Sequence, residues 1–169
     1  MSSQHPRVVL VGPPASGKTK IGKVLAQKLQ ESFVDTDTVL KTRFGPIPQI
    51  FAEQGEQWFR VREAEVVREF LATPGVLSLG GGAVTTASTR EALAEHTVVL
   101  LEISPEAVAS RLNNPKRPLL SGGVAQWQEL VAGRSMWYQD VATWQIDVSH
   151  RPTEAVAEEI AHYLEGVDV

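Results

Sequence analysis

The stretch GPPASGKT at residues 12–19 decides how the rest of the chain is interpreted. It has the spacing of a phosphate-binding loop: a glycine, four residues of any kind, then Gly-Lys-Thr. An apolar run, RVVLV at 7–11, precedes the loop, and a helical pattern begins at about residue 17. This is the strand–loop–helix context that such a loop requires. The motif therefore predicts a nucleotide-binding protein, and alone it predicts nothing finer.

Backbone N–H groups and the dipole of the following helix are what hold phosphate in such a loop. Pro13 and Pro14 have no N–H, but they lie on the approach from the strand, so we expect the loop to remain competent. Lys18 is expected to reach the β- and γ-phosphates and Thr19 to bind Mg²⁺. The loop residues expected to bind ATP are Ala15, Ser16, Gly17, Lys18, Thr19 and Lys20.

Length and composition indicate a single domain over residues 1–169, with 43% hydrophobic and 21% charged residues. The net charge of −4 argues against a nucleic-acid binder, which usually carries a basic excess. The absence of cysteine excludes disulfides and zinc–thiolate sites. No apolar run has the length of a signal peptide or a membrane span, so a cytoplasmic location is expected, and the small size favours a monomer.

Apolar runs alternate with helical patterns along the whole chain. The candidate strands are 7–11, 32–35, 76–80, 97–103 and 145–149. The candidate helices are 17–30, 55–72, 87–95, 104–113, 124–144 and 152–166. This alternation predicts an α/β fold of three layers, a five-stranded parallel sheet flanked by helices, with ligands at the carboxyl ends of the strands. Residues 114–123, NPKRPLLSGG, are interpreted as a mobile lid.

Two aspartates, Asp35 and Asp37, follow the second strand. One could serve Mg²⁺ and the other an acceptor hydroxyl, or they could only cap the next helix. In the helix at 55–72, Glu63 falls within an apolar stripe, three residues after Arg60. The pair is either an ordinary helix salt bridge or a brace that holds Arg60 ready for a ligand carboxylate.

Arg134 stands among apolar residues on one face of the helix at 124–144, with no acidic residue at helical spacing. It needs an anion, which could be a carboxylate of the protein or a bound substrate. Gly80, Gly81 and Gly82 follow the third strand and permit unusual backbone angles and a close approach to a ligand, although a plain turn explains them equally well. Arg117 is either a lid arginine or a solvated loop cation.

Together these segments resemble the shikimate kinases. The resemblance is carried by GPPASGKT, DTD, IFAEQGEQWFRVREAEVV, LSLGGG, KRPLL and GRSMWYQDVA, in the family's order and over nearly the whole chain. It implies a P-loop kinase fold related to the nucleoside monophosphate kinases. It also implies transfer of the γ-phosphoryl group of ATP to the 3-hydroxyl of shikimate, in aromatic amino-acid biosynthesis.

The resemblance also implies roles for individual residues. Asp35 would support the metal with Thr19, and Asp37 would bind the shikimate hydroxyls and serve as the base. Arg60, oriented by Glu63, and Arg134 would hold the shikimate carboxylate. Lys18, Asp37 and Arg117 would be catalytic. The remaining implied site residues are Gly80, Gly81 and Gly82 for shikimate, and Arg111, Arg151 and Pro152 on the adenine side of ATP.

The chain departs from the family pattern at Pro13, Pro14 and Ala15, where small or apolar residues are common. After Arg134 it reads Ser-Met-Trp-Tyr, where the family often continues with Pro-Leu-Tyr. No acidic residue ends the third strand, so Ser78 is the candidate to act there through a metal-bound water. The alternatives are another small-molecule kinase, such as a gluconate kinase, and a nucleotide-dependent switch or binding module without turnover.

Overall fold

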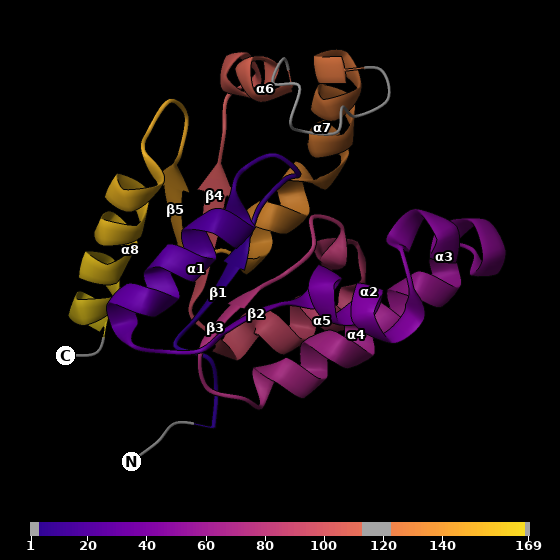
Figure 1. The fold of residues 1–169 in the computed structure, drawn as a ribbon, viewed down its shortest axis with the longest axis horizontal. Coiled ribbons are helices and arrows are strands. Elements are labelled where there is room, and N and C mark those ends of the chain that lie inside the picture. Colours follow the sequence, from indigo (N-terminus) through magenta and orange to yellow (C-terminus); the bar gives the residue numbers. More distant parts are fainter. Residues whose placement is uncertain (1–3, 113–122, 168–169) are drawn as a thin grey trace.

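The computed structural model describes residues 4–112 and 123–167. Arg117 lies outside this part of the chain, as does all of the expected lid except Gly123. Five strands form one sheet: β1 (Val8–Val11), β2 (Phe33–Asp35), β3 (Val76–Ser78), β4 (Val98–Glu102) and β5 (Trp144–Asp147). Their order is β2-β3-β1-β4-β5 and every neighbouring pair is parallel, which confirms the expected sheet (Figure 1).

The expected helices are present, with ends shifted by a few residues. They are α1 (Lys18–Leu29), α4 (Glu56–Leu71), α5 (Ala87–Ala92), α6 (Pro105–Leu112), α7 (Gly123–Val141) and α8 (Thr153–Val167). Short 3₁₀ turns at Ala83–Thr85 and Leu93–Glu95 flank α5. The helix expected over 124–144 was too long, because it ends at Val141 and Trp144 already belongs to β5.

Two helices were not expected, α2 (Thr36–Phe44) and α3 (Ile47–Gln54). Both are short, glycines end them at Gly45 and Gly55, and α3 has a proline in its first turn. Each buries one main apolar side chain, Leu40 or Ile50, in a small cluster with residues of α4. Figure 1 shows α2 and α3 projecting to one side of the sheet, where they form a separate lobe.

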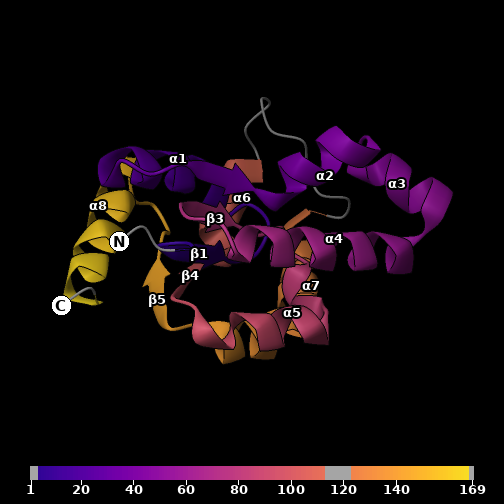
Figure 2. The same ribbon diagram turned by 90° about the horizontal axis from the view of Figure 1, so that it is seen from below.

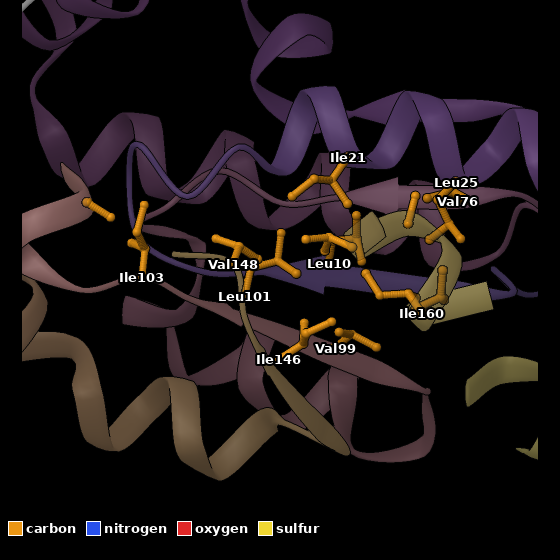
Figure 3. Packing of buried hydrophobic residues seen from close by; sticks show 14 of the residues in the cluster. Leu10, Ile21, Leu25, Val76, Val99, Leu101, Ile103, Ile146, Val148 and Ile160 are labelled. Carbon is orange, nitrogen blue, oxygen red and sulfur yellow. The ribbon is translucent and has the colours of Figure 1, made fainter. Parts of the chain in front are cut away.

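The two faces of the sheet are covered by different helices. Val8 and Leu10 belong to a buried cluster with residues of α1 and α8, shown in Figure 3. Val9 and Val11 belong to a second cluster with residues of α4, α5 and α7. This alternation follows from the period of two along a strand, and Figure 2 shows α1 and α8 opposite α5 and α7. Strands covered on both faces explain the continuous apolar runs in the sequence.

The register of the parallel strands places three segments close together where the strands have their carboxyl ends. Val11, at the end of β1, leads into the loop at 12–17, and Asp35 is paired in register with Ser78. The carboxyl ends of β1, β2 and β3 therefore meet where the phosphate-binding loop begins. Among the described helices, none combines the length and apolar character that crossing a membrane requires.

Candidate active site

The phosphate-binding loop curves so that its late amides turn to one side. Ala15 and Gly17 both have left-handed backbones, with φ of 71° and 85°. A chain that alternates in this way presents successive N–H groups to a concave surface, which suits an anion. The first turn of α1 contains no acidic side chain, so nothing there competes with phosphate for the positive end of the helix dipole. For Ala15 the left-handed backbone costs roughly 1–2 kcal/mol.

The two prolines of the loop contribute carbonyl groups in place of amides. Lys18 Nζ donates to the Gly12 carbonyl at 2.7 Å and to the Pro13 carbonyl at 3.1 Å. Trp127 Nε1, from α7, donates to the Pro14 carbonyl at 2.7 Å. The prolines therefore join the loop to its own lysine and to α7.

Lys18 is buried at the base of the loop. Burial lowers the pKa of Lys18 to about 8, against the opposing charges of Asp37 and Asp35. Both carboxylates are thus close enough to act on the lysine that is expected to meet the phosphates. The charge of Arg134, on α7, lowers the pKa of Lys18 further.

Asp35 caps α2, which is one of the two roles considered for it, and it also contacts Thr19. Its Oδ1 accepts from the backbone N–H of Asp37 at 2.9 Å, which caps α2. Its Oδ2 accepts from the Thr19 hydroxyl at 2.6 Å. Ser78 Oγ is buried nearby at the end of β3 and has no hydrogen-bond partner within the described part of the chain. Hydroxyl and carboxylate oxygens of this kind suit Mg²⁺.

One cleft of about 440 Å³ is lined by about half of the residues expected to bind ATP, the metal and the acceptor, whereas Arg60, Glu63, Gly82 and Arg134 do not line it. Its lining includes the predicted residues Ala15, Gly17, Lys18, Thr19, Lys20, Asp35, Asp37, Gly80 and Gly81. Lys23, Leu79 and Pro14 also line the cleft. Ser16 lies buried beneath it, with its hydroxyl unpartnered among the described residues.

Asp37 lies against the glycine segment. Burial raises the pKa of Asp37, Asp35 raises it further, and Lys18 and Arg60 lower it. A Cβ on Gly80 would overlap the Asp37 carboxylate. Thr36 next to it anchors the segment, because the Gly80 N–H donates to the Thr36 hydroxyl at 3.1 Å.

Arg60 and Glu63 form the expected pair on α4. Arg60 Nη1 donates to Glu63 Oε1 at 2.9 Å, and the Glu63 side chain is 2% exposed. Burial raises the pKa of Glu63 to about 7, and the charge of Arg60 and its hydrogen bond oppose that rise. Phe51 and Phe59 lie 5.9 and 5.3 Å from the guanidinium carbon of Arg60. A buried carboxylate and two rings thus hold this arginine in one place.

Gly82 makes room for the same arginine. A Cβ at Gly82 would lie 2.7 Å from Arg60 Cζ and closer still to the terminal nitrogens. Gly80, Gly81 and Gly82 are absent from the glycines with positive φ, so the expectation of unusual backbone angles was wrong. The expected close approach to a ligand stays a prediction; among the described residues, the atoms close to Gly80 and Gly82 belong to Asp37 and Arg60.

Arg134 is half-buried on α7 and acts on the same group of charges. It lowers the pKa values of Glu63 and Tyr138, which places its guanidinium near both side chains. The Glu63 carboxylate is therefore one anion near Arg134, although Glu63 also pairs with Arg60. Arg60 also lies 3.4 Å from the exposed Glu56 carboxylate, so only the weaker, solvent-exposed of its two partners would have to yield to a bound anion.

The expected adenine-side residues do not line this cleft, although Arg111 is next to it. Arg111 Nη1 donates to the Ala15 carbonyl at 2.5 Å, so Arg111 packs against the phosphate loop. Arg151 is paired with Glu159 at 3.1 Å, and Pro152 precedes the first turn of α8. Neither Arg151 nor Pro152 is among the residues that line the 440 Å³ cleft. Their assignment to adenine stays a prediction.

Several site residues escaped the sequence analysis. In the sequence, Trp127 and Tyr138 are two of the apolar residues on the helical face that carries Arg134, yet both donate hydrogen bonds to loops of the site. Phe51 and Phe59 were quoted within a motif and given no role. The one signal available was the spacing of Tyr138 four residues after Arg134, which places both on one face of a helix.

Comparisons with known proteins agree with this geometry. The sequence model of the shikimate kinase family matches residues 14–165. A shikimate kinase from Mycobacterium avium (strain 104) is 48% identical over 168 residues, covering 96% of this chain and 96% of that protein. The chain belongs to the shikimate kinase family. A solved shikimate kinase from Acinetobacter baumannii, in complex with shikimate, has a TM-score of 0.86 at 32% identity, covering 98% of this chain and 95% of that one.

Membership of the shikimate kinases makes the chain a phosphotransferase that uses ATP to phosphorylate shikimate. The first alternative, a gluconate kinase, shares the fold alone. A solved gluconokinase from Sinorhizobium meliloti has a TM-score of 0.62 at 18% identity, covering 98% of this chain and 95% of that one.

Proposed function

We propose that the chain transfers the γ-phosphoryl group of ATP to the 3-hydroxyl of shikimate, with Arg60 and Arg134 holding the carboxylate of the acceptor. The observation that carries this proposal is the pair of arginines around the buried Glu63, next to the cleft that the phosphate loop lines. Arginine suits a carboxylate because its planar fork can donate two parallel hydrogen bonds. Asp37 adds an acceptor for hydroxyl groups in the same cleft. A small acid with several hydroxyls matches this set.

Asp37 is proposed as the residue that orients the 3-hydroxyl and takes its proton. A bond forms between the 3-oxygen and the γ-phosphorus while the bond from that phosphorus to the β–γ bridging oxygen breaks, which leaves ADP. Burial raises the pKa of Asp37, and a carboxylate with a raised pKa accepts a proton more readily. Lys18, charged below its pKa of about 8, is proposed to hold the phosphate oxygens as negative charge shifts to ADP.

Mg²⁺ is proposed to bind at the Thr19 hydroxyl, with Asp35 and Ser78 acting through metal-bound water. When bound, Mg²⁺ neutralises charge on the phosphate oxygens. The fit rests on two observations: the Thr19–Asp35 hydrogen bond of 2.6 Å and the buried, unpartnered Ser78 hydroxyl at the end of the neighbouring strand. Thr19 and Asp35 also line the cleft that holds Lys18.

Arg117 is proposed to contact the transferring phosphate from the lid at 114–123, and Arg111, Arg151 and Pro152 to border the adenine. Arg117→Ala is then expected to lower kcat more than it raises the KM for shikimate. Steady-state kinetics measure both, and an unchanged kcat would remove Arg117 from the transfer step. A fall in ATP affinity on Arg151→Ala, with shikimate affinity kept, would support the adenine assignment.

The chain is also proposed to act as a single-domain monomer in the cytoplasm. Support for the monomer comes from the small size of the chain, 169 residues. The dependence on ATP agrees with the cytoplasm, where that nucleotide is abundant. Sedimentation at the concentration used for assays tests the monomer, and activity that rises steeply with protein concentration would contradict it.

A panel of acceptors tests the proposed reaction. ADP release is coupled to a spectrophotometric readout with shikimate, quinate and gluconate in parallel, and phosphorus NMR locates the new phosphate. We expect turnover on shikimate with the phosphate at the 3-position. Turnover on gluconate alone would refute the proposal. Tight ATP binding with no ADP release on any acceptor would instead favour a nucleotide-dependent binding module.

A further inference from the structure

The hydroxyl of Tyr138 connects α7 to the glycine segment at 80–82. Tyr138 is 3% exposed, and its hydroxyl donates to the Gly81 carbonyl at 2.6 Å. A tyrosine hydroxyl has one proton to donate and two lone pairs that can accept. Once the proton is given to Gly81, the remaining capacity of this buried oxygen is for a donor.

Arg134 is placed to supply that donor. It lies one helical turn before Tyr138 on the same face of α7. Burial raises the pKa of Tyr138, and the charge of Arg134 with its hydrogen bond to the hydroxyl partly offsets the rise. The Tyr138 hydroxyl thus lies between two groups, the Arg134 guanidinium and the Gly81 carbonyl.

The glycine segment is in contact with the other residues that would recognise the acceptor. Gly80 lies against the Asp37 carboxylate and Gly82 against the Arg60 guanidinium. The ring of Pro14 packs on Gly81, where an added Cβ would lie 3.1 Å from Pro14 Cδ. Three consecutive glycines therefore touch two acceptor-binding side chains and the phosphate loop, while Tyr138 adds Arg134 to the same segment.

We propose that Tyr138 is a positioning residue that holds Arg134 and the Gly81 carbonyl at a fixed separation. It thereby sets where the acceptor carboxylate sits relative to the phosphate loop. The inference rests on the proposed function, because it assigns Arg134 to the carboxylate of shikimate. Tyr138 itself is not assigned to the reacting atoms. Its effect passes through Arg134 and Gly81.

Tyr138→Phe tests this link because it removes the hydroxyl and keeps the ring. We expect kcat/KM for shikimate to fall about tenfold, mainly through KM, because Arg134 loses its partner while the ring still fills its site. The Kd for ATP should stay within twofold of the wild-type value. Tyr163→Phe is the matched control, since Tyr163 is the other of the two tyrosines and its ring stacks on Trp144. Wild-type turnover on shikimate tests the proposed function separately.

A double-mutant cycle separates positioning from general stability. If Tyr138 acts through Arg134, Tyr138→Phe should change kcat/KM by less than twofold in an Arg134→Ala background. An equal loss in both backgrounds would show a merely structural role and overturn the inference. So would a wild-type kcat/KM in the single variant, or an equal loss of affinity for ATP.

Fluorine NMR gives a readout that keeps the hydroxyl group at position 138. With 3-fluorotyrosine in place of tyrosine, two signals are expected, and the Tyr163→Phe variant assigns the remaining one to residue 138. Adding shikimate should shift the signal of residue 138 and leave that of residue 163 in place. A signal at residue 138 that does not respond to saturating shikimate would contradict the proposed link.

Discussion

Gly82→Ala is expected to damage the acceptor site while leaving the fold and the nucleotide site intact. The added Cβ would lie 2.7 Å from Arg60 Cζ, whereas carbon atoms in contact are normally about 3.5–4.0 Å apart. Gly82 has φ of −97° and ψ of 1°, which alanine can also adopt, so the backbone itself does not resist the change. The strain therefore falls on Arg60, whose guanidinium must move by about 1 Å.

The magnitude follows from how tightly Arg60 is held. Its bond of 2.9 Å to Glu63 fixes the guanidinium, so a shift of that size misplaces the fork that is to receive the shikimate carboxylate. A misplacement of about 1 Å costs roughly 100-fold in rate, or about 2.7 kcal/mol of transition-state stabilisation. Stability should change by less than about 1 kcal/mol, because alanine also restricts the unfolded chain.

The assay is ADP release at saturating ATP over a range of shikimate concentrations, with nucleotide affinity measured separately by calorimetry. Gly166→Ala is the control: Gly166 lies in α8 with nothing within 4 Å of an added Cβ. It should leave kcat/KM unchanged and raise stability by roughly 0.5–1 kcal/mol. A folded Gly82→Ala variant that keeps kcat/KM within threefold would refute the reasoning, as would an equal loss of ATP affinity.

Three further predictions concern the charges of the site. Arg134→Ala should weaken shikimate binding strongly in calorimetry, leave a measurable kcat/KM at high shikimate concentration and keep ATP binding; collapse of nucleotide affinity instead would make the role of Arg134 structural. The pKa of Glu63 rises from 4.5 to about 7 on folding, so the folded protein binds this proton more tightly than the unfolded chain. The resulting stabilisation is complete below pH 4.5 and is lost as the pH rises through 7. Relative to Glu63→Gln, the wild-type free energy of unfolding in urea should therefore fall by on the order of 3 kcal/mol between pH 4.5 and 8; a difference independent of pH would contradict this. Because the pKa of Lys18 is lowered to about 8, nucleotide binding near pH 8 should take up a proton and weaken up to about tenfold per pH unit above it; calorimetry in buffers of different ionisation enthalpy would show no such uptake if Lys18 stayed charged throughout.

The sheet and the phosphate loop were predictable because their signals are local. Continuous apolar runs such as RVVLV indicate strands covered on both faces, and the loop motif has fixed spacing. Asp35, Lys18 and Thr19 were expected at one edge for the same reason, and they do meet in one cleft. The helices α2 and α3 were missed because each is short and is stabilised by burial against α4, which no local pattern reveals.

The links between segments were not predictable, because they join residues far apart in the chain. Tyr138 and Gly81 are 57 residues apart, and Trp127 and Pro14 are 113 apart. In the sequence both aromatic residues belong to an apolar helical face. That pattern correctly predicts the burial of their rings, but it does not predict the hydrogen bonds that their polar atoms make. The role of Gly82 was hidden in the same way, since a glycine does not show which side chain occupies the space beside it.

The prolines at 13 and 14 gain a positive role from these distant contacts. A phosphate loop needs its late amides free for the nucleotide, so any anchoring of its early part must use other groups. Carbonyl groups do this here: Pro13 accepts from Lys18 and Pro14 accepts from Trp127. The ring of Pro14 also packs against Gly81, so the nucleotide loop touches the segment that contacts Asp37 and Arg60. Because the φ of proline is fixed, this contact limits the variation in the distance between the loop that binds the phosphoryl donor and the segment that contacts the acceptor-binding side chains.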